Sequence, residues 1–133
     1  MNTGHEGSMT TIHSNSPRDS LSRLESMILM GGIKLPVKSI QQMISSALDL
    51  IIQGNRLSDG TRKITSISEV VGMEGDMITL QEIFIFERKG IDEDGKVIGR
   101  FKATGIRPKV CEKLEAYGYH VDESIFSPNK VYE

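Results

Sequence analysis

The chain has 133 residues, of which 38% are apolar and 5% aromatic, and it contains no tryptophan. Sixteen basic and eighteen acidic residues leave a formal charge of −2 without a basic run that could follow a phosphate backbone, so nucleic-acid binding is disfavoured. The single cysteine excludes an intramolecular disulfide and favours the cytoplasm, and no stretch is apolar enough to predict a signal peptide or a membrane span. This length allows one domain with an aliphatic core.

The first third of the chain predicts a strand followed by two helices. Residues 8–13 have the pattern of an interior strand, and they follow the start so closely that we expect the chain to begin inside a larger fold. Ser16 and Pro17 then predict a helix start, and Gly31 with Gly32 predicts its end. A second helix should begin after Pro36, with a buried face made of Val37, Ile40, Met43, Ile44, Ala47 and Leu48.

The remaining sequence predicts an antiparallel meander and one more helix. Residues 50–52, 62–71 and 77–86 are rich in Ile, Val, Thr and Phe, and a weaker strand covers 97–103. Turn residues separate these runs at 58–60, 72–76 and 92–95. A last helix is expected over 108–117, ending at Gly118. We expect these elements, over 1–119, to form one unit and the tail over 120–133 to pack loosely.

Two of the three histidines lie in a short segment rich in glycine and hydroxyl side chains, GHEGSMTTIHSNS. If residues 8–13 are a strand, His13 stands at its carboxyl end, where open α/β sheets bind ligands. Its imidazole could meet a terminal phosphate or orient a water molecule there. The alternative is a histidine that only satisfies a neighbouring loop carbonyl.

The sequence gives little support for a zinc site, a calcium site or a catalytic cysteine. His5 and His13 are eight residues apart and no Cys-x-x-Cys pair exists, so we expect no zinc site. The acidic run at 92–95 lacks side-chain ligands at the first and twelfth positions of a calcium loop and is interpreted as a turn. Cys111 has no histidine at a nucleophile's spacing and should be a packed thiol.

Four blocks of sequence carry a resemblance to a known family. GHEGSMTTIHSNSPRDSLSRLE, LPVKSIQQMISSALDLIIQ, RLSDGTRKITSISEVVGMEGD and FKATGIRPKVCEKLEAYG occur in this order and cover nearly all of the chain. Together they resemble the secretion and pilus-assembly ATPases of the type II/type IV superfamily, most closely the CpaF/TadA branch that serves tight-adherence pili. The first block is similar to the histidine box of that family.

The resemblance implies particular roles for individual residues. His5 and His13 match the two histidines of the box, which in that family lies beside the terminal phosphate of ATP, and they are the expected catalytic pair. The hydroxyls of Thr10 and Thr11 match box positions. The resemblance implies that Arg23, Arg56 and Arg62 support the nucleotide site or a contact between subunits. Gly60 and Glu69 match the hairpin block, but no individual role can be assigned to them.

One departure from the family qualifies the expected activity. The chain has no G-x-x-x-x-G-K-[ST] loop, and its only Gly-Lys pair, Gly95-Lys96, is followed by Val97. Without this loop and the acidic strand that follows it in the family, the main parts of phosphoryl-transfer chemistry are absent. We therefore expect the C-terminal part of a RecA-like α/β core that is inactive alone, with ATP and Mg²⁺ used only by an intact parent.

The resemblance also implies partners and a location. The parent would be a homo-hexamer on the cytoplasmic side of the inner membrane, working with membrane-embedded platform proteins, with no nucleic acid and no transmembrane segment of its own. A second hypothesis is a non-enzymatic module that docks on intact ATPase subunits through surfaces normally used between neighbours. A third, an unrelated small α+β domain, would make the four-block match accidental.

Overall fold

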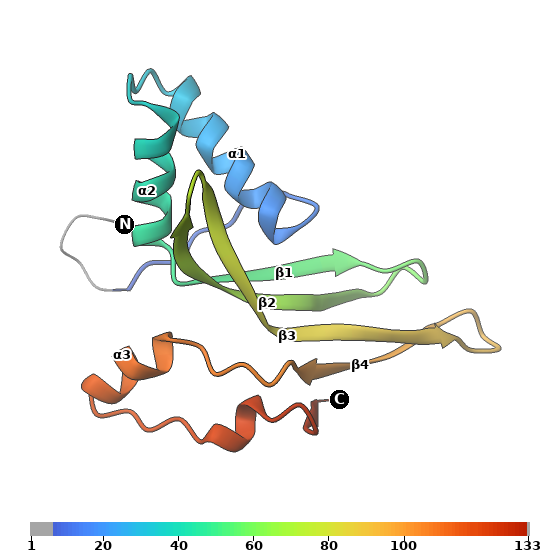
Figure 1. The fold of residues 1–133 in the computed structure, drawn as a ribbon. Coiled ribbons are helices and arrows are strands. Elements are labelled where there is room, and N and C mark those ends of the chain that lie inside the picture. The colour runs from blue at the N-terminus through green and yellow to red at the C-terminus, as the bar shows by residue number, and fades with distance from the viewer. Residues whose placement is uncertain (1–6, 133) are drawn as a thin grey trace. The chain divides into compact units, whose positions relative to one another are not determined.

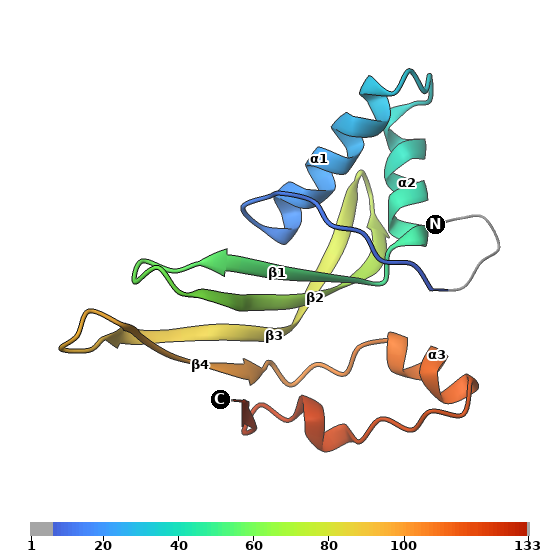
Figure 2. The ribbon, with the colours of Figure 1, turned by 180° about the vertical axis from the view of Figure 1, so that it is seen from behind.

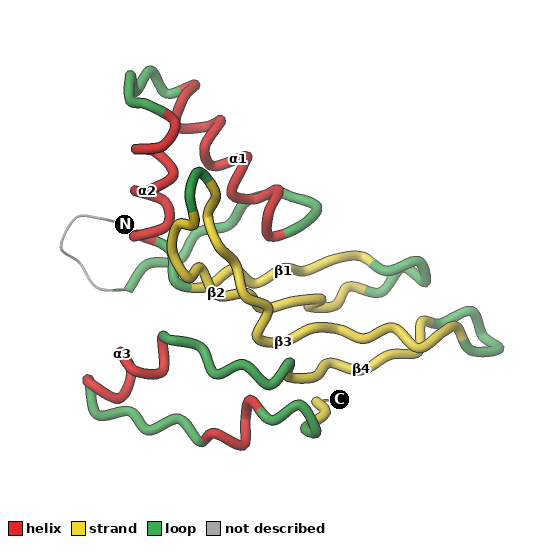
Figure 3. The backbone as a smooth tube through the Cα atoms, in the orientation of Figure 1, coloured by secondary structure: helices red, strands yellow, loops and turns green. Residues whose placement is uncertain are grey.

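The computed structural model describes residues 7–132, which form a mixed α/β fold. The order is α1 (Pro17–Met30), α2 (Val37–Ala47), β1 (Leu50–Arg56), β2 (Arg62–Glu74), β3 (Met77–Ile91), β4 (Val97–Ala103), α3 (Val110–Ala116), a 3₁₀ turn η1 (Glu123–Phe126) and β5 (Val131–Tyr132) (Figure 1). The strands follow one another in the sheet in chain order, which is the antiparallel meander expected from the sequence. Figure 3 shows these elements along the backbone trace.

The predicted strand over 8–13 is wrong for this structure. Residues 7–14 have no regular secondary structure, and the described sheet contains only β1 to β5. A strand is stable when its amide and carbonyl groups pair with a neighbouring strand. Because the hydrogen-bonded order of the described strands starts at β1, residues 8–13 have no strand partner among them.

Two compact units share the meander, and each is described separately. The first contains the described residues up to Ile51 together with Val70–Leu80, and the second contains Ile52–Glu69 with the described residues from Gln81 onward. The long strands β2 and β3 therefore contribute residues to both units.

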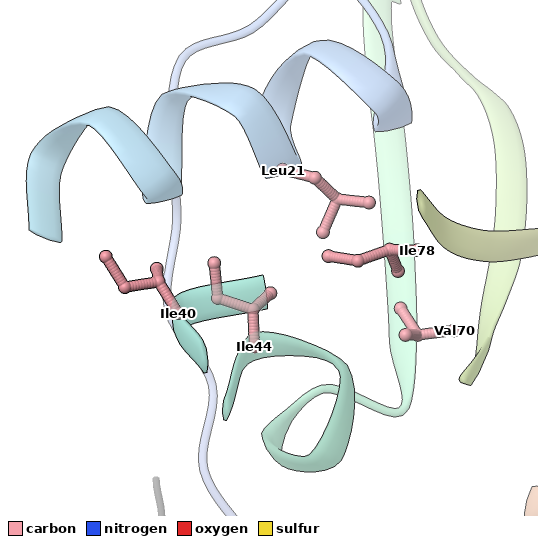
Figure 4. Packing of buried hydrophobic residues seen from close by; sticks show 5 residues of the cluster. All are labelled: Leu21, Ile40, Ile44, Val70 and Ile78. Atoms are coloured by element: carbon pink, nitrogen blue, oxygen red, sulfur yellow. The ribbon is translucent and has the colours of Figure 1, made fainter. Parts of the chain in front are cut away.

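The first unit packs the two helices around a small aliphatic core. Its buried residues, which face one another in Figure 4, are Leu21, Ile40, Ile44, Val70 and Ile78. The predicted stripe on α1 is confirmed, since Leu24 and Ile28 pack against this core. The predicted face of α2 is only half right, because Val37 and Met43 are 46% and 42% exposed.

The second unit has a separate core. Ile83, Cys111 and Phe126 are buried, and the rings of Phe84, Phe101 and Tyr132 lie 5.6–6.5 Å apart, centroid to centroid. Figure 2 shows from behind how the chain returns after α3 to place its last residues beside β4. The buried Cys111 agrees with the predicted packed thiol, and burial raises its pKa.

The segment after residue 120 packs closely, contrary to the expectation of a loose tail. Phe126 is 8% exposed, and β5 pairs with β4 through Phe101↔Tyr132 and Lys102↔Val131. The Tyr132 hydroxyl also donates to the carbonyl of Ile125 at 2.7 Å. The sequence of this segment has no apolar periodicity, so its packing could not be predicted from a pattern. Three separate contacts, rather than a repeated apolar face, hold the segment in place.

Candidate functional site

The candidate residues of the histidine segment lie on exposed backbone in the first unit. Thr10, Thr11 and His13 are all exposed, and His5 lies outside the described residues. His13 therefore precedes α1 from an irregular segment instead of ending a strand. The proposed position of its imidazole at a strand's carboxyl end is not found in this structure.

The start of α1 is held by a reciprocal cap. The Ser16 hydroxyl accepts a hydrogen bond from the Asp19 amide at 3.0 Å, and the Asp19 carboxylate accepts one from the Asn15 amide at 3.0 Å. This arrangement satisfies amides at the helix start and gives the chain after His13 a defined entry into α1. The bond from Asn15, helped by Arg23, lowers the pKa of Asp19.

Arg23 is joined to the same carboxylate. Its Nε lies 3.2 Å from Asp19 Oδ2, one helical turn away on α1, and both side chains are partly exposed. Asp19 thus connects Arg23 with Asn15, two residues after His13. Among the described residues, no hydrogen bond joins Thr10, Thr11 or His13 directly to Arg23.

Arg18 fixes the first turn of α1 to the strand beside it. Its guanidinium donates from Nη1 to the carbonyl of Ile78 in β3 at 2.6 Å, within the first unit. Arg18 is not among the residues to which the resemblance assigns a role. A long-range bond to a backbone carbonyl has no sequence periodicity, so no local pattern could have predicted it.

The arginines of the second unit flank the β1–β2 turn. Arg56 Nε donates to the carbonyl of Gly60 at 3.2 Å across the turn, whereas Arg62 is exposed at the first position of β2. Gly60 has φ +86°, which explains why glycine suits this turn. These two arginines belong to a different unit from His13 and Arg23.

Asp59 organises that turn and ties it to the next hairpin. Its Oδ1 accepts from both the amide and the hydroxyl of Thr61, at 2.9 and 2.6 Å, and its Oδ2 accepts from the amide of Val97 in β4 at 2.7 Å. The Thr61 hydroxyl, followed by the Val97 amide, lowers the pKa of Asp59 to about 2. Sequence reasoning treated Asp59 only as turn chemistry.

Glu69 has a clear structural duty in the second unit. Its two carboxylate oxygens accept hydrogen bonds from the amides of Lys109 and Val110, each at 2.9 Å, and the residue is 4% exposed. These amides open α3, which has no side-chain cap of its own. The sequence matched Glu69 to the hairpin block, but its partners are forty residues away and could not be read from it.

The Gly95-Lys96 pair does not form a phosphate-binding loop in the part of the chain that the structure describes. Gly95-Lys96 lies in the β3–β4 turn, where Asp92 Oδ1 accepts from the amides of Asp94 and Lys96, so its backbone is not arranged as a phosphate cradle. No group of three or more potential metal ligands occurs between residues 7 and 132.

Over residues 7–132, no helix is both long and apolar enough to cross a bilayer.

A family model described as type II/IV secretion system protein matches residues 1–121. The chain belongs to the type II/IV secretion system protein family. This match defines the family, but it does not distinguish the CpaF/TadA branch.

Similar curated proteins come from conjugation systems. The conjugal transfer protein TrbB of Rhizobium radiobacter is 39% identical over 74 residues, which are 56% of this chain and 20% of that protein. A candidate conjugal transfer protein from each of two Mycobacterium tuberculosis strains, CDC 1551 and H37Rv, is 29% identical over 75 residues, or 56% of this chain and 21% of the relative. The matched part thus spans about a fifth of these relatives.

Proposed function

We propose that this chain forms part of an ATP-driven motor of a pilus-assembly, secretion or conjugal transfer machine. The family match over residues 1–121 is the observation that carries this proposal. The whole motor would be a hexamer acting beside a membrane through platform proteins, as the resemblance to the CpaF/TadA branch implies. Since the residues here do not form a phosphate cradle, the isolated chain is expected to be inactive.

Within that motor, His13 and Arg23 would serve the nucleotide site or a contact between subunits, together with His5, Thr10 and Thr11. The link from Asn15 through Asp19 to Arg23 supports this assignment, because it gives the segment after His13 a fixed relation to Arg23. Arg56 and Arg62 would serve a second surface of the motor, since the β1–β2 turn holds Arg56 through Gly60.

The first test is to read the DNA upstream of the Met1 codon in the same frame. A continuous frame that encodes a Gly-rich Lys-Ser/Thr loop and an acidic strand would support the motor. A stop codon followed by a ribosome-binding site next to Met1 would contradict it for this gene product.

Activity gives the second test of the same proposal. The isolated chain should hydrolyse ATP no faster than a buffer control, measured by phosphate release. In a protein that joins this chain to the loop-bearing part, His13→Ala should lower turnover about 100-fold. Turnover within a few-fold of the unmodified protein would refute the role of His13.

A non-enzymatic docking module is a second candidate, favoured by exposed apolar side chains at the α1–α2 connection. Met27, Met30, Leu35 and Val37 are 59%, 85%, 41% and 46% exposed. Such surface often marks a protein contact. Binding of the isolated chain to an intact family ATPase, lost in Met30→Ser but kept in the exposed-site control Lys38→Ser, would favour this module; no association in analytical ultracentrifugation would reject it.

A further inference from the structure

One face of the sheet in the second unit combines isoleucines with cations. We use the name basic face for the following residues, all of which belong to the second unit: Ile52, Arg56, Arg62, Ile64, Lys89, Ile98, Arg100 and Lys102. The isoleucines at 52, 64 and 98 are 60%, 48% and 48% exposed. Single exposed apolar residues are ordinary, but isoleucines gathered among cations on four neighbouring strands need an explanation.

Pairing in the β3–β4 hairpin places part of this face. Glu87 lies opposite Arg100, and Ile85 lies opposite Lys102, so these four side chains share one side of the hairpin. The Glu87 carboxylate contacts Lys102 at 2.7 Å and also pairs with Lys89. Three cations thus surround one carboxylate, because Arg100 also lies 3.9 Å from it.

Side-chain contacts place the β1–β2 residues on the same side. Lys63 lies over the ring of Phe86, so these two side chains are on the same side of the sheet. Side chains alternate along a strand, so Glu87 is on the other side from Phe86, and Arg62 and Ile64 are on the other side from Lys63. Arg62 and Ile64 therefore share the side of Glu87. On β1, Asn55 contacts the Thr65 hydroxyl at 2.7 Å on the Lys63 side. Alternation then puts Ile52 and Arg56 on the basic face.

The chemistry of this face selects its partner. On the strands of this face, Arg56, Arg62, Lys89, Arg100 and Lys102 accompany one carboxylate, Glu87, so the strand surface has a positive excess, while the acids Asp59, Asp92, Glu93 and Asp94 lie in the adjoining turns. Charge complementarity therefore requires an acidic partner, and the isoleucines require apolar groups between its acids. Within this unit, α3 lies away from the two hairpin turns and leaves the strands there uncovered by it (Figure 1).

We propose that the basic face binds an acidic amphipathic segment of a partner protein. A membrane surface is disfavoured because interfacial binding sites use aromatic side chains, whereas Phe84, Phe86 and Phe101 are on the opposite side. The same lack of stacking rings disfavours single-stranded nucleic acid. Protection of a sheet edge does not explain the face either, since Arg62 and Ile64 are in β2, which has neighbours on both sides.

The inference is independent of the nucleotide-site proposal and can be tested on the full chain by methyl and amide NMR. The probe is a synthetic amphipathic helix with leucines on one side flanked by glutamates, and its control has lysines in place of the glutamates. The glutamate peptide should shift the methyl signals of Ile52, Ile64 and Ile98, and the lysine peptide should not.

Variants make the test specific. Arg100→Gln combined with Lys102→Gln should weaken binding of the glutamate peptide about tenfold. Arg88→Gln, a matched change on the opposite side of β3, should leave it unaltered. Amide spectra of each variant establish that it is folded, and Ile98→Ser gives an apolar counterpart that should also weaken binding.

Several results would overturn the proposal. These are no binding of the glutamate peptide, equal binding of both peptides, or shifts that map to the Phe86 side. Binding to phosphatidylglycerol vesicles or to an oligothymidylate, without binding of the peptide, would assign the face to another kind of partner. Concentration-dependent shifts of the same methyl groups without any peptide would identify a second copy as the occupant.

Discussion

Glu69 shows how one buried carboxylate can replace the missing cap of a short helix. Its oxygens accept from the amides of Lys109 and Val110 at the start of α3. Glu69→Ala should lower the free energy of unfolding by about 1–3 kcal/mol, because two partly buried amides lose their acceptor. Urea denaturation measures this change, and the exposed Glu82→Ala serves as the control; equal midpoints for both variants would reject the capping role.

Asp59 predicts a pH dependence. Its folded pKa of about 2 is lower than the usual value of 3.8, so the ionised carboxylate stabilises the fold above the unfolded pKa and this contribution is lost as pH falls toward 2. In the same range Glu87 also titrates at about 2, because Lys102 and Lys89 stabilise its charge.

The Asp59 contribution can be separated by substitution. Between about pH 4 and 2, the stability of Asp59→Asn should fall less steeply than that of the unmodified chain. Denaturation at a series of pH values, with carboxyl NMR titration of Asp59, tests this. An Asp59 pKa near the usual value would contradict the hydrogen bonds to Thr61 and Val97.

Two positions of α2 differ in how strongly they hold this helix against the core of the first unit. Ile40 of α2 is fully buried, whereas Val37, one turn earlier, is 46% exposed. Ile40→Ala should cost about 2–5 kcal/mol of unfolding free energy, and Val37→Ala much less, because only the first leaves a cavity. Thermal and urea unfolding of both variants decides this, and similar losses would mean that Val37 is buried in solution.

Sequence patterns predicted the elements whose signals are local. Ser16, Pro17 and Gly31 marked α1 correctly, and the β-rich runs with their turns gave the meander. The strand over 8–13 failed because strand formation depends on a partner that periodicity cannot supply. The turn expected over 72–76 is also shorter, since β2 continues through Glu74.

The candidate site was less predictable than the fold. Sequence resemblance selected Arg23 and Arg56, but it could not find the groups that hold them, Asp19 and the Gly60 carbonyl, or the bond from Arg18 to β3. The Asp19 bonds are local, and the Ser16-Pro17-Arg18-Asp19 pattern that predicts the start of α1 includes both Ser16 and Asp19. The bond from Asp59 to Val97 spans 38 residues and could not.

At the scale of the whole molecule, the end of the chain matters to the second unit although the family match stops at residue 121. Phe126 is buried, and Tyr132 lies against Phe84 and Phe101. Removal of residues 122–133 should therefore expose these rings and the β4 edge.

This truncation has a measurable outcome. The shortened chain should lose near-ultraviolet circular dichroism, lower its unfolding midpoint and bind a hydrophobic dye, because part of an aromatic core is gone. Truncation only of the last residue, Glu133, provides the control. Unchanged spectra and stability after removal of 122–133 would show that the segment does not complete the core.

The division of β2 and β3 between two units also constrains how the chain folds during its synthesis. The first unit is complete only when Leu80 has been synthesised. By then residues Ile52–Glu69 of the second unit have already been synthesised, but the residues from Gln81 onward, which complete that unit, have not. Neither unit can be finished as a simple N-terminal block, so both must wait for sequence-distant pairing, which is slow compared with local helix formation. A nascent chain stalled soon after Ala47 would present two helices without the strand residues Val70 and Ile78 that bury them.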